Sequence, residues 1–257
     1  QNYYNELSKT KTYSQINTLN TILKVFFNWC SVNGYIIKNP CSNLNLKGNK
    51  TDIINHKRKE VEILNSKEIK TIKEHIKNTD FELLFLLDLG TGLRQGELLA
   101  LDWKHIDLKK KEIKIEQSAK EVYIYDNSEH KHIETVIQTP KTQNSFRTIP
   151  LPSSLIDKLT EIDNKKGYLF LDSQGQLLKG KNVSTKWTKI LKECNIPHKK
   201  FHSIRHTYGS MLLQKGVDIE TVAELMGHTA ISITQIYMHS DTKIKSKSVN
   251  KLNSILN

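Results

Sequence analysis

Apolar residues recur every three or four positions over much of the chain, a spacing typical of α-helices. The first such segment covers residues 14–35 and ends near Gly34. A helix with an apolar stripe is amphipathic and needs a partner. We therefore expect this stripe to lie in a core. Its apolar positions are Ile16, Leu19, Ile22, Leu23, Val25, Phe26, Phe27 and Trp29.

A polar stretch separates this segment from the rest of the chain. Residues 47–60, KGNKTDIINHKRKE, are mostly basic and show no periodicity, and Pro40 precedes them in a turn that cannot continue a helix. We place a domain boundary here, which divides the chain into a helical region 1–46, a basic linker 47–61 and a larger domain 62–257. A basic linker can follow a phosphate backbone, so its candidate DNA-binding residues are Lys57, Arg58 and Lys59.

Three helices are expected next. One begins at Ser66, which we interpret as its N-cap. The second begins at Asp80, is almost wholly apolar (FELLFLLDLG) and ends at Gly90. In the sequence TGLRQGELLALDW that follows, a glycine-rich turn leads to Arg94 at the start of a third helix, with Glu97 one turn later on the same face.

Residues 112–151 alternate between β-branched or aromatic and polar residues, which predicts a small antiparallel sheet of three or four strands. Its last hairpin, TPKTQNSFRTIPLP, places Lys141 beside a turn. Helical periodicity then returns, so the fold class is mainly α with a small antiparallel β-sheet. The expected later helices are 153–163, 182–194, 201–215, 219–226 and 231–237, followed by a basic tail, 238–257, with a short apolar helix.

Composition narrows the class of protein. The chain has 257 residues, 37% of them hydrophobic, which is enough for one large domain and a small one. No apolar run approaches the roughly 18 residues of a membrane span. The three cysteines are too few for a disulfide framework, so we expect reduced thiols and a cytoplasmic location. The tryptophans, Trp29, Trp103 and Trp187, lie in apolar periodic segments and are expected in cores.

The charge balance favours a polyanionic partner. There are 39 Lys and Arg against 27 Asp and Glu, a net charge of +12. Lysine-rich surfaces also occur without such a partner, so the positions of the basic residues matter more than their total. Walker A, GxGxxG and HExxH motifs are absent, as is a carboxylate cluster for a metal, and we expect neither metal nor cofactor.

Residues 201–237 contain the densest set of candidate reactive groups. His202 and Arg205 are three residues apart and share a helix face, where they can grip one anion. His228 follows a glycine, and Tyr237 supplies a phenol nine residues later. Two basic groups, a further histidine and a phenol indicate phosphate chemistry without a metal, in which side chains neutralise the developing charge.

Five sequence motifs occur in one order: TGLRQGELLALDW, PKTQNSFRTIPLP, HSIRHTYGSMLLQKG, ELMGH and Tyr237. Together they resemble the tyrosine recombinases, the phage-integrase family, over residues 62–240. The extended β-region is similar to integrases of conjugative transposons and temperate phages rather than to compact Xer resolvases. The resemblance implies a tyrosine-recombinase catalytic domain, preceded here by a partial helical core-binding domain, because residues 1–50 are too short for the usual four-helix clamp.

The resemblance also assigns roles to individual residues. It implies DNA cleavage and rejoining through a 3′-phosphotyrosine intermediate, without metal or ATP. Glu97 is the acidic residue beside the first arginine, and Arg147 is a further candidate for DNA binding. The implied catalytic residues are Arg94, Lys141, His202, Arg205, His228 and Tyr237.

Each residue taken singly has a structural alternative. Arg94 and Glu97 can form a helical salt bridge, and Lys141 can be an ordinary exposed lysine. His228 can cap a helix end, and Tyr237 can be an aromatic contact. His206 is expected to be structural.

The implied partners are double-stranded DNA, three further copies in a homo-tetramer, and accessory DNA-bending or excision proteins, with no membrane. Residues 243–257 resemble the segment by which each protomer docks on its neighbour. Three alternatives stay open: an Xer-like resolvase, a topoisomerase-like nicking and closing enzyme, and a non-catalytic DNA-binding regulator on this fold.

Overall fold

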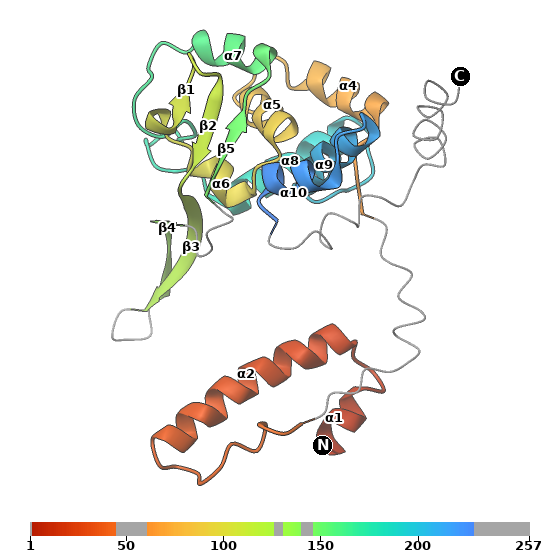
Figure 1. Cartoon of the computed structure of the whole chain (residues 1–257), viewed down its shortest axis with the longest axis vertical. Helices are drawn as coiled ribbons and strands as arrows, with labels where there is room; N and C mark the ends of the chain where they lie inside the picture. Colours follow the sequence, from red (N-terminus) through yellow and green to blue (C-terminus); the bar gives the residue numbers. More distant parts are fainter. Residues whose placement is uncertain (1, 45–60, 126–130, 140–145, 229–257) are drawn as a thin grey trace, which may run out of the picture. The chain divides into compact units, whose positions relative to one another are not determined.

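The computed structural model describes residues 2–44, 61–125, 131–139 and 146–228. The chain forms two compact units, Gln1–Glu60 and Val61–Asn257 (Figure 1).

Within its described residues, 2–44, the smaller unit contains two helices, α1 (Asn2–Leu7) and α2 (Tyr13–Val32). α2 begins with a capping box, in which Thr12 and Gln15 satisfy each other's backbone N–H groups. Tyr4 donates a hydrogen bond to Asn20 Oδ1 at 3.3 Å, and this contact joins the two helices. The buried apolar side chains described in this unit are Tyr4, Ile16, Cys30 and Cys41.

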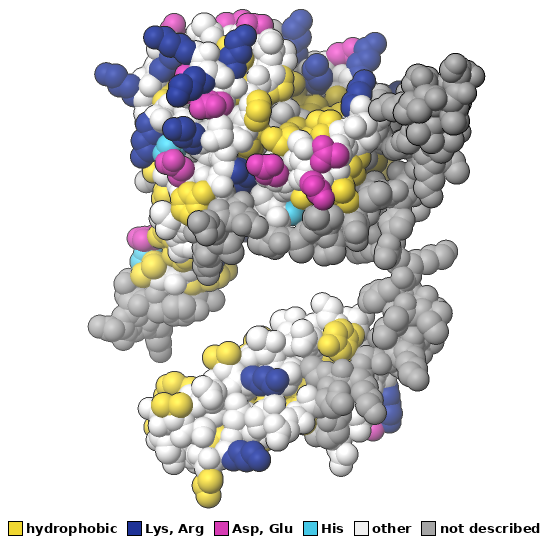
Figure 2. Space-filling view, in the orientation of Figure 1, with side chains coloured by type: hydrophobic (Ala, Val, Ile, Leu, Met, Phe, Trp, Pro, Cys, Tyr) yellow, Lys and Arg dark blue, Asp and Glu magenta, His cyan; other side chains and the backbone are white. Residues whose placement is uncertain are grey.

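The apolar stripe of α2 is largely exposed, contrary to our expectation. Phe26 is 53% exposed and Trp29 55%, and Figure 2 shows hydrophobic side chains on the surface of this unit. Trp29 stacks on Tyr35 with ring centroids 5.4 Å apart instead of entering a core. The prediction was wrong because one short helix and a loop cannot cover a stripe that runs the length of a 20-residue helix.

The larger unit carries most of the helices that the sequence predicted. Its first helix, α4, is capped by Asn65, whose Oδ1 accepts from the N–H groups of Lys67 and Glu68, so the predicted cap at Ser66 was wrong by one residue. The helices are α4 (Ser66–His75), α5 (Glu82–Thr91), α6 (Gln95–Leu99), α7 (Ser153–Thr160), α8 (Gly180–Glu193), α9 (Ser203–Gln214) and α10 (Ile219–Met226), with a 3-10 turn, η1 (Trp103–His105).

The strands form two sheets rather than the single sheet we predicted. β1 (Ile106–Asp107), β2 (Glu112–Ile115) and β5 (Arg147–Pro150) make an antiparallel sheet in the order β1-β2-β5. Among the described strands, β3 (Ser118–Tyr125) and β4 (Lys131–Gln138) pair with each other alone, and in Figure 1 this hairpin projects from the body of the larger unit. Alternating polarity locates strands but does not say how they pair.

The core of the larger unit lies between the three-stranded sheet and the helices. Trp187 of α8 is 1% exposed and stacks on Phe85 of α5, with ring centroids 6.0 Å apart. Trp103 is 8% exposed. These two tryptophans are in the core, as predicted. In Figure 1 helices α5, α8, α9 and α10 lie to one side of the sheet, which brings α5 and α9 together.

The first residues of the larger unit are held against α9 and α10. The Leu64 N–H donates to Thr207 Oγ1 at 2.8 Å, two residues after Arg205. Val61 packs against a small cluster that contains Tyr208, Val222 and Met226. Among the described helices, none is long and apolar enough to cross a membrane. In Figure 2 lysine and arginine side chains gather over the upper part of this unit, with acidic side chains among them.

Candidate active site

The turn between α5 and α6 positions Arg94. Gly92 ends α5 in the left-handed conformation, with φ of 60°, and Arg94 is the N-cap residue of α6. The Arg94 guanidinium donates from Nη1 to Glu97 Oε1 at 2.8 Å and from Nη2 to the Gly227 carbonyl. Its side chain is still 38% exposed. This guanidinium is therefore held in place and accessible to a ligand.

The start of α9 positions Arg205 and two histidines. Arg205 is 2% exposed and donates to the carbonyls of Gly92 and Met226. His202, at the N-cap position of α9, is exposed. Its ring meets that of His206 edge to face at a centroid distance of 4.5 Å. The predicted pair therefore combines a buried guanidinium with an accessible imidazole.

The C-terminus of α10 is the point where these groups meet. Gly227 ends the helix with φ of 63°, and the His228 N–H donates to the Ala223 carbonyl at 2.9 Å. Three successive carbonyls at this end each accept a hydrogen bond from a different arginine. They are Leu225 from Arg147, Met226 from Arg205 and Gly227 from Arg94. Cationic groups at a helix C-terminus are favoured by the helix dipole.

The histidines of this cluster are neutral at pH 7. Burial, and then the charges of Arg205 and Arg94, lower the pKa of His228 to about 4. The His202 ring is open to solvent on one part of its surface, and partial desolvation by its neighbours, followed by the charges of Arg205 and Arg94, lowers the pKa of His202 below its ordinary value. Burial and the charges of His202 and Arg205 lower the pKa of His206 to about 4. Neutral imidazoles beside two guanidiniums can accept a proton or share one in a hydrogen bond.

Glu97 is enclosed by two arginines. Burial alone would raise the pKa of Glu97, but the hydrogen bonds and charge of Arg147, followed by Arg94, lower it. Arg147 donates from Nη1 and Nη2 to the two Glu97 oxygens at 3.1 and 2.8 Å. Its side chain is only 5% exposed. We predicted Arg147 as a DNA-binding residue, whereas the structure places its side chain inside the unit against a carboxylate.

Asp88 is a residue that our reading of the sequence did not single out. It lies on α5, is 1% exposed, and its Oδ1 has no hydrogen-bond partner among the described residues. Burial raises the pKa of Asp88 well above its ordinary value, against the lowering effect of the Arg205 charge, and the Glu97 charge adds to the rise. The one signal in the sequence was an acid inside the apolar run FELLFLLDLG.

Several predicted residues lie outside the described part of the chain. They are Lys57, Arg58, Lys59, Lys141 and Tyr237, together with the helix 231–237 and the tail. Within the described residues, no group of three or more His, Cys, Asp or Glu is placed to hold a metal ion.

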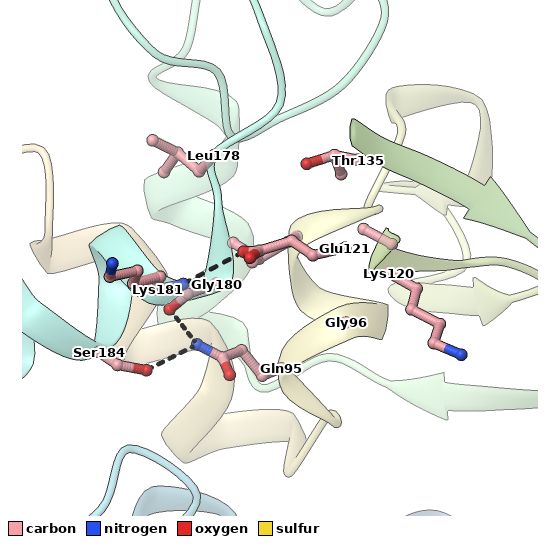
Figure 3. Close-up of a pocket in the computed structure, with 11 residues that line it drawn as sticks. Gln95, Gly96, Lys120, Glu121, Thr135, Leu178, Gly180, Lys181 and Ser184 are labelled. Carbon is pink, nitrogen blue, oxygen red and sulfur yellow. Dashed lines mark hydrogen bonds between the residues drawn. The ribbon is translucent and has the colours of Figure 1, made fainter. Parts of the chain in front are cut away.

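A cleft of about 370 Å³ begins at the residue after Arg94 (Figure 3). It lies between α6, the β3–β4 hairpin and the N-terminus of α8. Gln95 Nε2 donates to the Gly180 carbonyl at 3.0 Å, and Glu121 Oε1 accepts from the Lys181 N–H at 3.3 Å. Figure 3 shows Gln95 and Glu121 reaching the same end of α8. Their hydrogen bonds therefore connect α6 and the β3–β4 hairpin to this helix.

Comparison with known proteins gives consistent matches. The profile of the phage integrase family matches residues 62–243. A tyrosine recombinase XerC-like protein of Caldanaerobacter subterraneus subsp. tengcongensis is 41% identical over 276 residues, which cover 99% of this chain and 70% of that protein. The ICEBs1 integrase of Bacillus subtilis is 26% identical over 258 residues, which cover 94% of this chain and 66% of that protein.

The fold is also found among solved structures. The Tn1549 transposon integrase, in complex with a circular intermediate DNA, superposes with a TM-score of 0.66 at 21% identity. The match covers 98% of this chain and 83% of that one. At 21% identity, this similarity shows that the two chains share a fold.

Proposed function

Because the chain belongs to the phage integrase family, we propose that it is a site-specific DNA recombinase that integrates or excises a mobile element. The observation that carries this proposal is the cluster at the C-terminus of α10. There Arg94 and Arg205 meet two neutral histidines, His202 and His228. This arrangement suits a phosphodiester in its transition state.

Charge stabilisation is the first task of such a site. A phenol attacking a phosphodiester places extra negative charge on the non-bridging oxygens. Guanidinium groups stay charged and offer planar pairs of donors that match phosphate oxygens. Arg94 and Arg205 therefore bind the scissile phosphate, and His228 adds a hydrogen bond.

Proton transfer is the second task. The Tyr237 oxygen bonds to phosphorus as the bond to the 5′ oxygen breaks. His202 takes the phenol proton, a role that its lowered pKa permits at pH 7. Lys141 donates a proton to the departing 5′ oxygen. The 3′-phosphotyrosine keeps a phosphodiester-like bond, so a new 5′ hydroxyl can displace Tyr237 without ATP.

The units take different roles in this proposal. Residues 1–46 are a partial core-binding domain, 47–61 a basic linker and 62–257 the catalytic domain. Lys57, Arg58 and Lys59 follow the DNA backbone. Four protomers assemble on two double-stranded sites, with accessory DNA-bending or excision proteins, and a DNA substrate places this activity at the nucleoid in the cytoplasm.

The direct test is a search for a covalent adduct. The protein is incubated, in EDTA and without ATP, with DNA from the ends of the element that encodes it, and the products are separated under denaturing conditions. We expect a protein–DNA adduct that Tyr237→Phe abolishes and that Tyr35→Phe, at an exposed phenol of the smaller unit, leaves unchanged. Tight binding without an adduct would favour the non-catalytic regulator.

A resolvase is the second candidate, favoured by the 41% identity to an XerC-like protein. The chemistry is the same, but the outcome differs. Deletion products from directly repeated sites on one molecule indicate resolution, while joining of separate molecules indicates integration. Products that differ only in linking number indicate nicking and closing.

The tail is proposed to dock each protomer on its neighbour. Deletion of residues 243–257 is expected to weaken cooperative assembly on DNA in gel-shift titrations, while single-protomer binding is kept. Unchanged cooperativity would exclude this role.

A further inference from the structure

We propose that Arg147 is a positioning residue for the recombination reaction, acting through Glu97 and the C-terminus of α10 rather than through DNA. The inference rests on the proposed function, because it concerns the geometry of the same site. It assigns to Arg147 a role different from the DNA contact that its motif suggested.

Arg147 contacts two separate groups, the Glu97 carboxylate and the C-terminus of α10. Its Nη1 and Nη2 donate to both oxygens of Glu97, and its Nε donates to the Leu225 carbonyl at 2.8 Å. Glu97 in turn accepts from the Arg94 backbone N–H and guanidinium. One planar guanidinium therefore connects the carboxylate that orients Arg94 to the helix end that precedes His228.

The glycine at the end of α10 fits closely against the same side chain. A Cβ added to Gly227 would lie 3.0 to 3.2 Å from three atoms of the Arg147 side chain. The helix end and the guanidinium are thus in contact along the backbone as well as through the hydrogen bond. A shift of Arg147 would move or loosen the residues that lead to His228.

The position of Arg147 in the chain extends this link. It is the first residue of β5, six residues after Lys141, and β5 is paired along its length with β2. The end of the lysine hairpin is therefore anchored to the same carboxylate as Arg94. Arg147 holds Arg94 and the segment that leads to His228 at fixed positions relative to the strand β5. Catalysis requires reacting groups to be positioned to within a fraction of an ångström, and this contact supplies that positioning.

The contacts of the Arg147 guanidinium argue against direct phosphate binding. Its Nη1 and Nη2 donate to the two oxygens of the Glu97 carboxylate, which neutralises its charge, and its Nε donates to the Leu225 carbonyl. A lysine at position 147 could reach Glu97 with one ammonium group but could not also supply the second arm to Leu225, because only guanidinium has a rigid fork. Arg147→Lys keeps the positive charge but loses the simultaneous hydrogen bonds to Glu97 and Leu225, which makes it the informative variant.

The experiment measures cleavage and binding separately. Single-turnover cleavage is followed at saturating DNA for wild type, Arg147→Lys and Arg147→Gln, and DNA affinity is measured at several salt concentrations in a Tyr237→Phe background. We expect cleavage by Arg147→Lys to slow roughly tenfold or more, because misplacement by about 1 Å can cost about a hundredfold. Affinity and its salt dependence should stay as in wild type.

The opposite result would identify a phosphate contact. Loss of one such contact lowers the slope of log K against log salt by about 0.9. Such a change in Arg147→Lys or Arg147→Gln, or cleavage at the wild-type rate, overturns the proposal. Lys114→Gln, at an exposed cation on the neighbouring strand β2, is the matched control and should cleave at the wild-type rate.

Two further measurements separate positioning from misfolding and from failure of the proposed function. Glu97→Gln combined with Arg147→Gln should cleave no more slowly than the worse single variant, because both act as one unit. Additive losses would contradict this. Amide exchange at His228, whose N–H donates to Ala223, should accelerate at least tenfold in Arg147→Lys even if wild type forms no adduct. Unchanged exchange overturns the proposal.

Discussion

Arginine side chains in this site are held by backbone carbonyls. Arg94, Arg147 and Arg205 each donate to one of three successive carbonyls at the end of α10. A buried guanidinium needs acceptors for its donors, and a helix C-terminus offers unpaired ones. The helix end thus holds the three guanidiniums in fixed positions, and such ordering lowers the conformational entropy that a site loses when it binds an anion.

The buried carboxyl of Asp88 makes the stability of the protein depend on pH. Its folded-state pKa is raised above the ordinary value of about 3.9. Its contribution to stability is therefore full below that value and is lost as the pH rises through the folded-state pKa. Asp88→Asn, which mimics the protonated acid, should raise the thermal midpoint at pH 8 and have a smaller effect as the pH falls toward 5.

The measurement is thermal unfolding of both proteins from pH 5 to 9. The difference between their midpoints should widen with pH. Parallel curves would mean that Asp88 is ionised in the folded protein throughout this range.

Among the elements, the turn from α5 to α6 leaves no room for a side chain at Gly92. Gly92 has φ of 60°, and a Cβ there would lie 2.2 Å from Tyr208 Cδ1. Its carbonyl also accepts from Arg205. The end of α5 therefore lies tightly against α9 at Gly92, the residue whose carbonyl accepts from Arg205.

Gly92→Ala should destabilise the larger unit by about 2–5 kcal/mol, the sum of a left-handed alanine and an overpacked contact. Cleavage should also fall, because Arg205 would move with the carbonyl. Denaturant titration and single-turnover cleavage check these outcomes.

Gly175→Ala is the matched control for the backbone effect. Gly175 has φ of 75° with no atom within 4 Å of an added Cβ, so only about 1–2 kcal/mol is expected. Equal losses in the two variants would show that the contact with Tyr208 does not contribute.

At the scale of the whole molecule, the two units differ in how many apolar side chains they bury. The two hydrophobic clusters of the larger unit consist entirely of residues from position 61 onward. The smaller unit buries few side chains among those described and leaves much of α2 exposed. A domain with its own core can fold alone, whereas a small one with little core is marginal.

Residues 61–257 alone should therefore unfold within about 3 °C of the main transition of the full chain, which corresponds to less than about 1 kcal/mol. Differential scanning calorimetry of both proteins measures this. A much lower midpoint for the shorter protein would mean that the first 60 residues stabilise the larger unit.

The sequence by itself determined the family, the fold class and the candidate reactive groups. Motifs such as TGLRQGELLALDW and HSIRHTYGSMLLQKG are local, and helical periodicity depends on neighbouring residues alone. The start of the helix that follows Arg94 and both ends of the helix that carries Arg205 were therefore predicted within a few residues. Spacing along a helix also placed Glu97 beside Arg94.

Tertiary structure decided which faces are covered and which distant groups meet. The bond between Arg94 and Gly227 joins residues 133 positions apart, and no local pattern encodes it. The same holds for the burial of Arg147, the exposure of Trp29 and the pairing of β3 with β4. The physical reason is that burial is a property of packing between elements, so the same apolar or basic residue lies inside or outside according to what covers it.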